Sequence, residues 1–159
     1  MKQIPYWMDT APALPDRSGK DLPDEADVVV IGGGLTGLST AYHAARKGAR
    51  VVLVEKDQVG SGASGRNGSH CNPGITISPA QARQRYGQER ARELYDAFRV
   101  AVDVVEEIAV REKIDCDFHR AGRLGLVCKP KHLEGMHAKQ RDLAENFGHE
   151  TVVLSKSEL

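Results

Sequence analysis

The sequence lacks several features that would indicate other classes of protein. Aromatic residues make up only 5% of its 159 residues, and its three cysteines form no C-x-x-C pair. An odd number of scattered cysteines favours reduced thiols over a disulfide framework, so we expect a cytoplasmic protein. No apolar run is long enough for a membrane span, and residues 1–26 hold no stretch long enough for a signal peptide.

The sequence also has no excess of charge of either sign, because 22 Lys and Arg residues balance 22 Asp and Glu residues. This balance gives no electrostatic reason to expect nucleic acid or anionic lipid as a partner. Metal binding is unsupported as well, since His132 and His137 are five positions apart and do not share a helix face. A small molecule is therefore the expected partner.

The most informative stretch is residues 27–55, DVVVIGGGLTGLSTAYHAARKGARVVLVE. Its four apolar residues from Val28 to Ile31 predict a strand of a parallel sheet, covered on both faces. Gly32, Gly34 and Gly37 then match G-x-G-x-x-G. In that motif the first glycine allows a tight turn, the second a close approach to a pyrophosphate, and the third close packing of helix and strand.

The rest of this stretch predicts a helix that stops at Gly48 and a second strand, Val51 to Val54. The helix N-terminus offers unpaired N–H groups and the positive end of a dipole, which suit a diphosphate. Glu55 ends the second strand at the acidic position of the dinucleotide fingerprint. A carboxylate there can accept both hydroxyl hydrogens of an adenosine ribose and would repel a 2′-phosphate, which disfavours NADP. A glycine-rich turn in an ordinary α/β domain is the weaker alternative.

Residues 56–74 form a connection rich in Gly, Ser and Asn, and its length favours a functional loop over a flexible surface linker. Small residues from Gly60 to Gly65 would let backbone N–H groups approach phosphate oxygens. Ser64, Arg66 and Asn67 would add side-chain donors. The loop therefore predicts a second region of contact with an anionic ligand.

The first 26 residues contain four prolines, which predicts an extended N-terminal arm. Residues 5–8, PYWM, could pin this arm to the surface, although simple covering of apolar area is the favoured interpretation.

Beyond the loop, Ser78, Pro79 and Gln81 predict a helix start with a capping box. After a break at Gly87, apolar residues three or four apart between 91 and 109 predict a long packing helix with a solvated charged face.

The remaining residues predict short elements. Residues 117–129 favour two short strands forming a hairpin, 131–147 a helix that stops at a glycine, and 152–154 a strand. Ser155 and Glu158 match a capping box, so a further helix is expected to begin there.

Several of these motifs resemble those of the D-amino-acid-oxidase-like flavoproteins, and among them the bacterial γ-glutamylputrescine oxidase-like group. The similar segments are IGGGLTGLSTAYHAARKGARVVLVEK, GSGASGRNGSHCN, PYWMDTAP and DCDFHRAGRLGLVCKPKH. The resemblance implies FAD, bound by the glycine turn, the acid and the GASGRN run, and this run favours FAD over NAD. It assigns cofactor binding to Gly32, Gly34, Thr36, Gly37, Glu55, Lys56, Ser64, Gly65, Arg66 and Asn67, and it identifies no catalytic residue.

By the same resemblance, His70 and Cys71 lie nearer the flavin ring. The resemblance disfavours a covalent flavin link at His70, because relatives with a histidyl-flavin bond carry that histidine nearer to Arg66 in the loop. A catalytic base at His70 is also disfavoured, because flavoenzymes can take hydride directly from a neutral amine. Cys71 is expected to be a packed thiol.

The expected fold is α/β, with a Rossmann-like FAD-binding strand–helix–strand (βαβ) unit followed by the start of an α+β substrate domain. We expect an arm over residues 1–26, the N-terminal part of an FAD-binding domain over 27–113, and the truncated beginning of a substrate domain over 114–159. The sequence offers no third strand that clearly belongs to the dinucleotide fold. The domain is therefore expected to be incomplete and to expose an open edge and an open face of its sheet.

The expected function is that of an FAD-dependent oxidoreductase acting on the CH–NH group of a small-molecule amine or amino acid, with this chain carrying the ADP-binding part. One alternative is a non-catalytic, truncated nucleotide-binding module, alone or paired with a complementary C-terminal polypeptide. The other is an NAD-dependent dehydrogenase, which the glycine turn and Glu55 permit.

Overall fold

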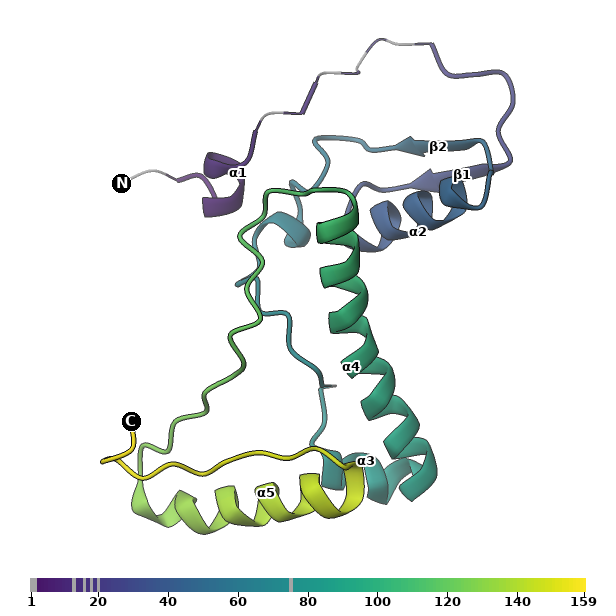
Figure 1. Cartoon of the computed structure of the whole chain (residues 1–159). Coiled ribbons are helices and arrows are strands. Elements are labelled where there is room, and N and C mark those ends of the chain that lie inside the picture. The colour runs from purple at the N-terminus through teal and green to yellow at the C-terminus, as the bar shows by residue number, and fades with distance from the viewer. Residues whose placement is uncertain (1–2, 13, 16, 18, 20, 75) are drawn as a thin grey trace. The chain divides into compact units, whose positions relative to one another are not determined.

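The structure is a computed structural model, and it describes residues 3–12, 14–15, 17, 19, 21–74 and 76–159. The chain divides into two compact units, Met1–His70 and Cys71–Leu159, called the N-terminal and C-terminal units (Figure 1). This division follows packing within the chain, so the functional boundary expected between residues 113 and 114 stays a prediction.

Two parallel strands joined by a helix form the centre of the N-terminal unit. Strand β1 (Val28–Ile31) pairs with β2 (Val51–Val54), with the first residue of one opposite the first residue of the other. Helix α2 (Leu35–Arg46) connects them and packs against both strands (Figure 1). Gly48 follows the helix with a φ of +89°, a value that favours glycine. The two predicted strands and the helix between them are confirmed.

Only one face of β1 is covered by the described residues. Val30 is buried, with 8% of its surface exposed, whereas Val29 and Ile31 are 60% and 87% exposed. Successive side chains of a strand point to opposite faces, and α2 covers the face to which Val30 belongs. The prediction that β1 is covered on both faces is therefore wrong for this part of the chain.

An ion pair joins the ends at which the two strands begin. The Asp27 carboxylate accepts hydrogen bonds from Arg50 Nη2 at 2.9 Å and from the Arg50 backbone N–H at 2.8 Å. Arg50 Nη1 lies 3.2 Å from a Glu25 oxygen. Hydrogen bonds from the Arg50 side chain, and then from its backbone, hold the pKa of Asp27 below its ordinary value. This contact was not predicted from the sequence.

The N-terminal arm is not extended throughout. A short helix, α1 (Tyr6–Thr10), interrupts it, so the prediction of an extended arm is wrong over these residues. Pro5 precedes the helix, and its carbonyl accepts from two backbone N–H groups at 3.0 Å. The part of that prediction on residues 1–2, 13, 16, 18 and 20 lies outside the described residues.

Three helices pack around a small apolar core in the C-terminal unit. They are α3 (Pro79–Tyr86), α4 (Gln88–Arg111) and α5 (Leu133–Phe147), and a single 3₁₀ turn, η2 (Pro130–His132), precedes the last. Their core consists of Ala82, Ala91, Leu143 and Phe147. The core is small because two of its four members are alanines.

The starts and stops of these helices follow local sequence signals. Ser78 Oγ accepts from the Gln81 N–H and the Gln81 side chain accepts from the Ser78 N–H, which is the predicted capping box. Gly87 has a φ of +79° and separates α3 from α4, and Gly148 ends α5 in a left-handed conformation. The capping box, the break and the stop are confirmed.

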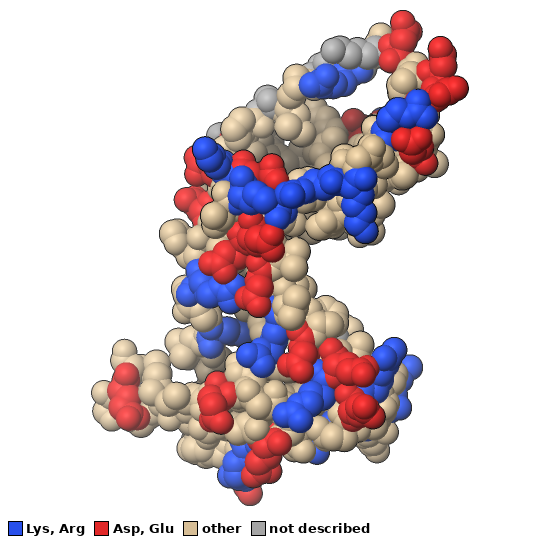
Figure 2. Space-filling model, turned by 45° about the vertical axis from the view of Figure 1, so that its right-hand side comes forward, with Lys and Arg blue, Asp and Glu red and all other residues tan. Residues whose placement is uncertain are grey.

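The long helix α4 carries charged residues along its exposed side. Arg120 Nη2 lies 2.7 Å from Asp103, and Arg120 Nε donates to Glu106 at 2.8 Å. Figure 2 shows Lys and Arg beside Asp and Glu over the face in view. Exposed pairs of this kind add little stability, which fits the predicted solvated face. Among the described residues, no helix is long and apolar enough to cross a membrane.

Two segments predicted as strands are irregular. Neither residues 117–129, expected to form a hairpin, nor residues 152–154 form strands. Leu124 is 64% exposed, so the apolar side of the expected hairpin has no cover. An isolated two-stranded hairpin is marginal in water, and the described residues supply no further strand to it. At Ser155, a hydrogen bond from its N–H to Glu158 forms at 2.8 Å, but a turn replaces the predicted helix.

Candidate functional site

The glycine turn follows β1 directly and is fixed by backbone contacts. The Gly32 N–H donates to the Val54 carbonyl at 2.8 Å, so the turn begins where the paired strands end. Gly32 has a φ of +103°, a conformation that other residues rarely adopt. A Cβ on Gly37 would lie 1.9 Å from the Gly32 carbonyl oxygen. Glycine at position 37 therefore allows α2 to begin this close to the turn.

Glu55 follows β2 and reaches back to this turn. Its Oε2 accepts from the Gly33 N–H at 2.6 Å, and its Oε1 accepts from the Asp57 N–H at 3.1 Å. These bonds, in that order, hold the pKa of Glu55 below its ordinary value; burial opposes them, and Lys56 acts in their direction. The side chain is thus an ionised acceptor at neutral pH, with lone pairs left for other donors.

The N-terminus of α2 presents backbone N–H groups beside the turn. Ser64 Oγ accepts from the Leu35 N–H at 2.9 Å. No hydrogen bond from the Thr36 or Gly37 N–H occurs among the residues that the structure describes. First-turn N–H groups lie at the positive end of the helix dipole and favour anions.

The loop after β2 repeats the arrangement of the glycine turn. The Gly60 N–H donates to the Gly33 carbonyl at 3.0 Å, and Gly60 has a φ of +77°. A Cβ on Gly65 would lie 2.3 Å from the Gly60 carbonyl oxygen. A short 3₁₀ helix, η1 (Ala63–Gly65), ends at the second of these glycines. In both loops, a glycine five positions later packs against the carbonyl of a glycine with positive φ.

The polar side chains predicted in this loop are partly engaged with the loop itself. Arg66 Nε donates to the Ser61 carbonyl at 3.0 Å. Asn67 Nδ2 donates to the Ser64 carbonyl at 2.5 Å, and Asn67 Oδ1 accepts from the Ser69 N–H at 2.7 Å. These contacts hold the loop in shape and reduce the number of donors free for a ligand.

The structure brings most of the predicted site residues into one region of the N-terminal unit. Direct contacts join the turn, the acid, the start of α2 and the following loop through Gly32, Gly33, Gly37, Leu35, Glu55, Gly60 and Ser64. A Cβ on Gly34 would lie 3.0 Å from Ser64 Oγ, so this position also faces the loop. Lys56 and Arg66 are exposed, and Arg66 bonds to Ser61 instead of another predicted site residue.

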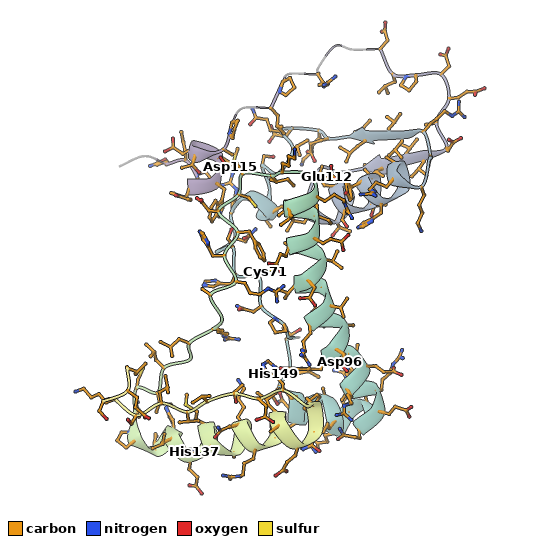
Figure 3. All side chains as sticks on the ribbon, in the orientation of Figure 1. Cys71, Asp96, Glu112, Asp115, His137 and His149 are labelled. Carbon is orange, nitrogen blue, oxygen red and sulfur yellow. The ribbon has the colours of Figure 1, made fainter. Side chains whose placement is uncertain are left out.

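Sequence reasoning missed Gly33, which is buried and gives its N–H to Glu55 and its carbonyl to Gly60. The run of three consecutive glycines was the available signal. His70 is exposed. Cys71 (Figure 3) is also exposed, so the prediction of a packed thiol is wrong.

Comparison with known proteins identifies the family. The family model described as FAD dependent oxidoreductase (DAO) matches residues 27–159. This chain belongs to the DAO family. FAD, the cofactor of this family, was the cofactor predicted from the sequence, and the resemblance to D-amino-acid-oxidase-like flavoproteins is confirmed.

Three proteins to which this chain is similar are named as oxidoreductases. The γ-glutamylputrescine oxidoreductase of Escherichia coli is 35% identical over 128 residues, which cover 80% of this chain and 30% of the relative. The probable oxidoreductase OrdL of Haemophilus influenzae is 30% identical, over 82% of this chain and 30% of the relative. An OrdL protein of Rhizobium meliloti is 38% identical, over 59% of this chain and 22% of the relative. The chain thus spans about a third or less of these proteins. No solved structure matches it.

The geometry is compatible with the ADP half of the FAD on which the DAO family depends. Glycines 32 to 34 leave the turn without side chains, so a pyrophosphate could approach the backbone. The Thr36 and Gly37 amides would supply donors to it. The ionised Glu55 would supply the acceptor for ribose hydroxyls, because its two bonds to backbone leave lone pairs.

Proposed function

We propose that this chain carries the ADP-binding part of an FAD-dependent enzyme that oxidises the CH–NH group of an amine or amino acid. The observation that supports it best is the Glu55 carboxylate, held 2.6 Å from the Gly33 N–H at the glycine turn. This bond joins the ribose acceptor to the phosphate-binding backbone. The chain then forms a Rossmann-like, incomplete FAD-binding unit, and residues 114–159 begin a substrate domain.

Each predicted cofactor residue has a role in this proposal. The turn and the start of α2 would hold the pyrophosphate and the acid would hold the ribose, while the second loop would continue toward the flavin. The residues in this order are Gly32, Gly34, Thr36 and Gly37 for the pyrophosphate, Glu55 and Lys56 for the ribose side, and Ser64, Gly65, Arg66 and Asn67 in the loop. FAD, when bound, supplies the hydride acceptor.

The proposed amine class of substrate is supported by one relative, whose name describes it as an oxidoreductase of γ-glutamylputrescine. Loss of hydride from a carbon that bears nitrogen, followed by loss of a proton from that nitrogen, gives an imine, which water hydrolyses to a carbonyl compound and the released amine. The cytoplasmic location is proposed from the three free cysteines.

Titration calorimetry of the purified chain with FAD and with NAD tests the cofactor assignment. We expect FAD to bind and NAD to bind much more weakly. Glu55→Ala should weaken FAD binding by about ten- to a hundredfold, because hydrogen bonds to a charged group are lost. Glu55→Gln, which keeps one acceptor oxygen, should have a smaller effect, and Glu93→Ala on α4 should have none. Tighter binding of NAD than of FAD would refute the proposal.

The substrate class is tested with the FAD-loaded protein under anaerobic conditions. Mixing with a γ-glutamyl amine, a primary diamine and a set of amino acids should bleach the flavin absorbance for at least one of them. Bleaching by hydroxy acids alone would contradict oxidation of a CH–NH group.

A second candidate is a non-catalytic nucleotide-binding module, which the bond between Glu55 and the Gly33 N–H supports equally well. In that case, FAD is retained without bleaching by any amine. Recovery of bleaching after addition of a polypeptide matching the remaining length of the relatives would show that a complementary chain completes the enzyme.

A further inference from the structure

The N-terminal arm contacts the loop after β2 through two consecutive residues of α1. Trp7 Nε1 donates to the Asn67 carbonyl at 2.9 Å, across 60 positions of sequence. Met8 Cγ lies 3.7 Å from the place that a Cβ on Gly65 would take. These two interactions are called the arm contact. They reach the loop at two positions of the run proposed to bind the cofactor.

Helix α1 depends on contacts outside itself. It has five residues, no side-chain cap and no buried residue. Helices shorter than about 12 residues are marginal in water, because nucleation is costly. The Tyr6 ring packs edge-on against the Trp7 ring at 4.8 Å, which orients the indole but adds no tertiary contact. The arm contact therefore supplies what the helix lacks.

A continuous series of hydrogen bonds leads from the arm contact to the start of α2. The Asn67 carbonyl accepts a hydrogen bond from Trp7, and the Asn67 side-chain Nδ2 donates to the Ser64 carbonyl at 2.5 Å. Ser64 Oγ in turn accepts from the Leu35 N–H at 2.9 Å. The turn from 64 to 67 is thus held by the arm on one side and by α2 on the other.

We infer that Trp7 is a positioning residue, through which α1 fixes the loop from Gly60 to Asn67 in the conformation that binds the cofactor. This inference rests on the proposed function for the coupling to FAD, but the arm contact exists without the cofactor. If the arm contact strengthens FAD binding by some factor, bound FAD must stabilise the arm contact by the same factor, because coupling between two sites is reciprocal. A tryptophan that merely covers apolar surface would show neither effect.

Trp7 is the only tryptophan of the chain, so its fluorescence reports the arm contact directly. We expect iodide to quench it weakly in the wild type. Met8→Ala should raise the quenching constant by about two- to threefold, since Trp7 is 36% exposed and release makes it fully accessible. Gly65→Ala should do the same from the loop side. The control Tyr6→Phe should leave quenching unchanged. Equal quenching of the wild type and both release variants would overturn the arm contact.

FAD titrations then test the coupling. Trp7→Phe keeps the aromatic ring but removes the N–H donor, and it should raise the Kd for FAD about fivefold, the equivalent of one neutral hydrogen bond. Tyr6→Phe should leave the Kd unchanged. In the wild type, FAD should lower the iodide quenching of Trp7. An unchanged Kd in Trp7→Phe overturns the positioning role. A wild type that does not bind FAD overturns the proposed function and the coupling, whereas the quenching data still decide the arm contact.

Discussion

The two units of this chain are stabilised in different ways. In the N-terminal unit, the glycine turn, Glu55 and the second loop are joined by hydrogen bonds to backbone, and positions 37 and 65 have no room for a side chain. In the C-terminal unit, three helices share a core of four buried residues, two alanines, one leucine and one phenylalanine, and much apolar surface stays exposed. The N-terminal unit therefore depends on geometry fixed by polar groups, whereas the C-terminal unit depends on a few buried side chains.

A large change in the core of the C-terminal unit should destabilise that unit and leave the stability of the N-terminal unit unchanged. Phe147 is 2% exposed and its ring centre lies 4.9 Å from that of Tyr95. Phe147→Ala should cost about 3–5 kcal/mol of unfolding free energy, through lost burial and a cavity. Hydrogen exchange should then rise in α3, α4 and α5 but not in β1 and β2. The control Phe98→Ala, at 39% exposure, should cost less than about 1 kcal/mol. An equal rise in the strands would mean that the units unfold together.

Adding a methyl group should have opposite effects on stability at two helical glycines, one in each unit. Gly37→Ala places a Cβ 1.9 Å from the Gly32 carbonyl oxygen, so α2 must move away from the turn. We expect a loss of about 2–3 kcal/mol and of FAD binding. Gly135 in α5 has open space, so Gly135→Ala should stabilise its unit by about 0.5–1 kcal/mol. Thermal unfolding and FAD titration measure both, and a stabilising Gly37→Ala would contradict the turn geometry.

Acid should weaken the N-terminal unit through its two hydrogen-bonded carboxylates. The pKa values of Asp27 and Glu55 are lowered in the folded chain, chiefly by hydrogen bonds from Arg50 and from the Gly33 backbone. A lowered pKa contributes stability above the ordinary carboxyl value and loses it as pH falls through the folded value. Exchange at β1 and β2 amides should therefore rise below about pH 4. Asp27→Asn combined with Glu55→Gln should flatten this dependence, and an unchanged slope would show that other groups cause it.

The smallest expected change in unfolding free energy concerns two capping-box sequences, one that begins a helix and one that does not. Ser78→Ala removes the acceptor for the Gln81 N–H at the start of α3 and should cost about 1 kcal/mol. Ser155 has a similar sequence pattern but precedes only a turn, so Ser155→Ala should change unfolding free energy by less than about 0.5 kcal/mol. Urea unfolding measures both. Equal losses would mean that the turn after Ser155 contributes as much as a helix start.

Parts of the site that depend on residues close together in the sequence could be predicted from the sequence alone. The strand ends, the glycine turn and the stops at Gly48, Gly87 and Gly148 follow local rules of backbone conformation, and all were found where expected. The role of Gly33 was missed because its N–H finds its partner 22 positions away. The Trp7 bond was missed for the same reason, at 60 positions.

The sequence by itself determined where the strands and helices of the dinucleotide motif begin and end, because capping, glycine conformation and apolar periodicity act over a few residues. Tertiary structure alone decided which predicted strands form. Residues 117–129 and 152–154 have strand patterns, yet a strand exists only when a neighbour accepts its hydrogen bonds and covers its apolar face. It also decided that the loop after β2 is fixed on one side by α2 and on the other by the arm, since both contacts join residues far apart in the chain.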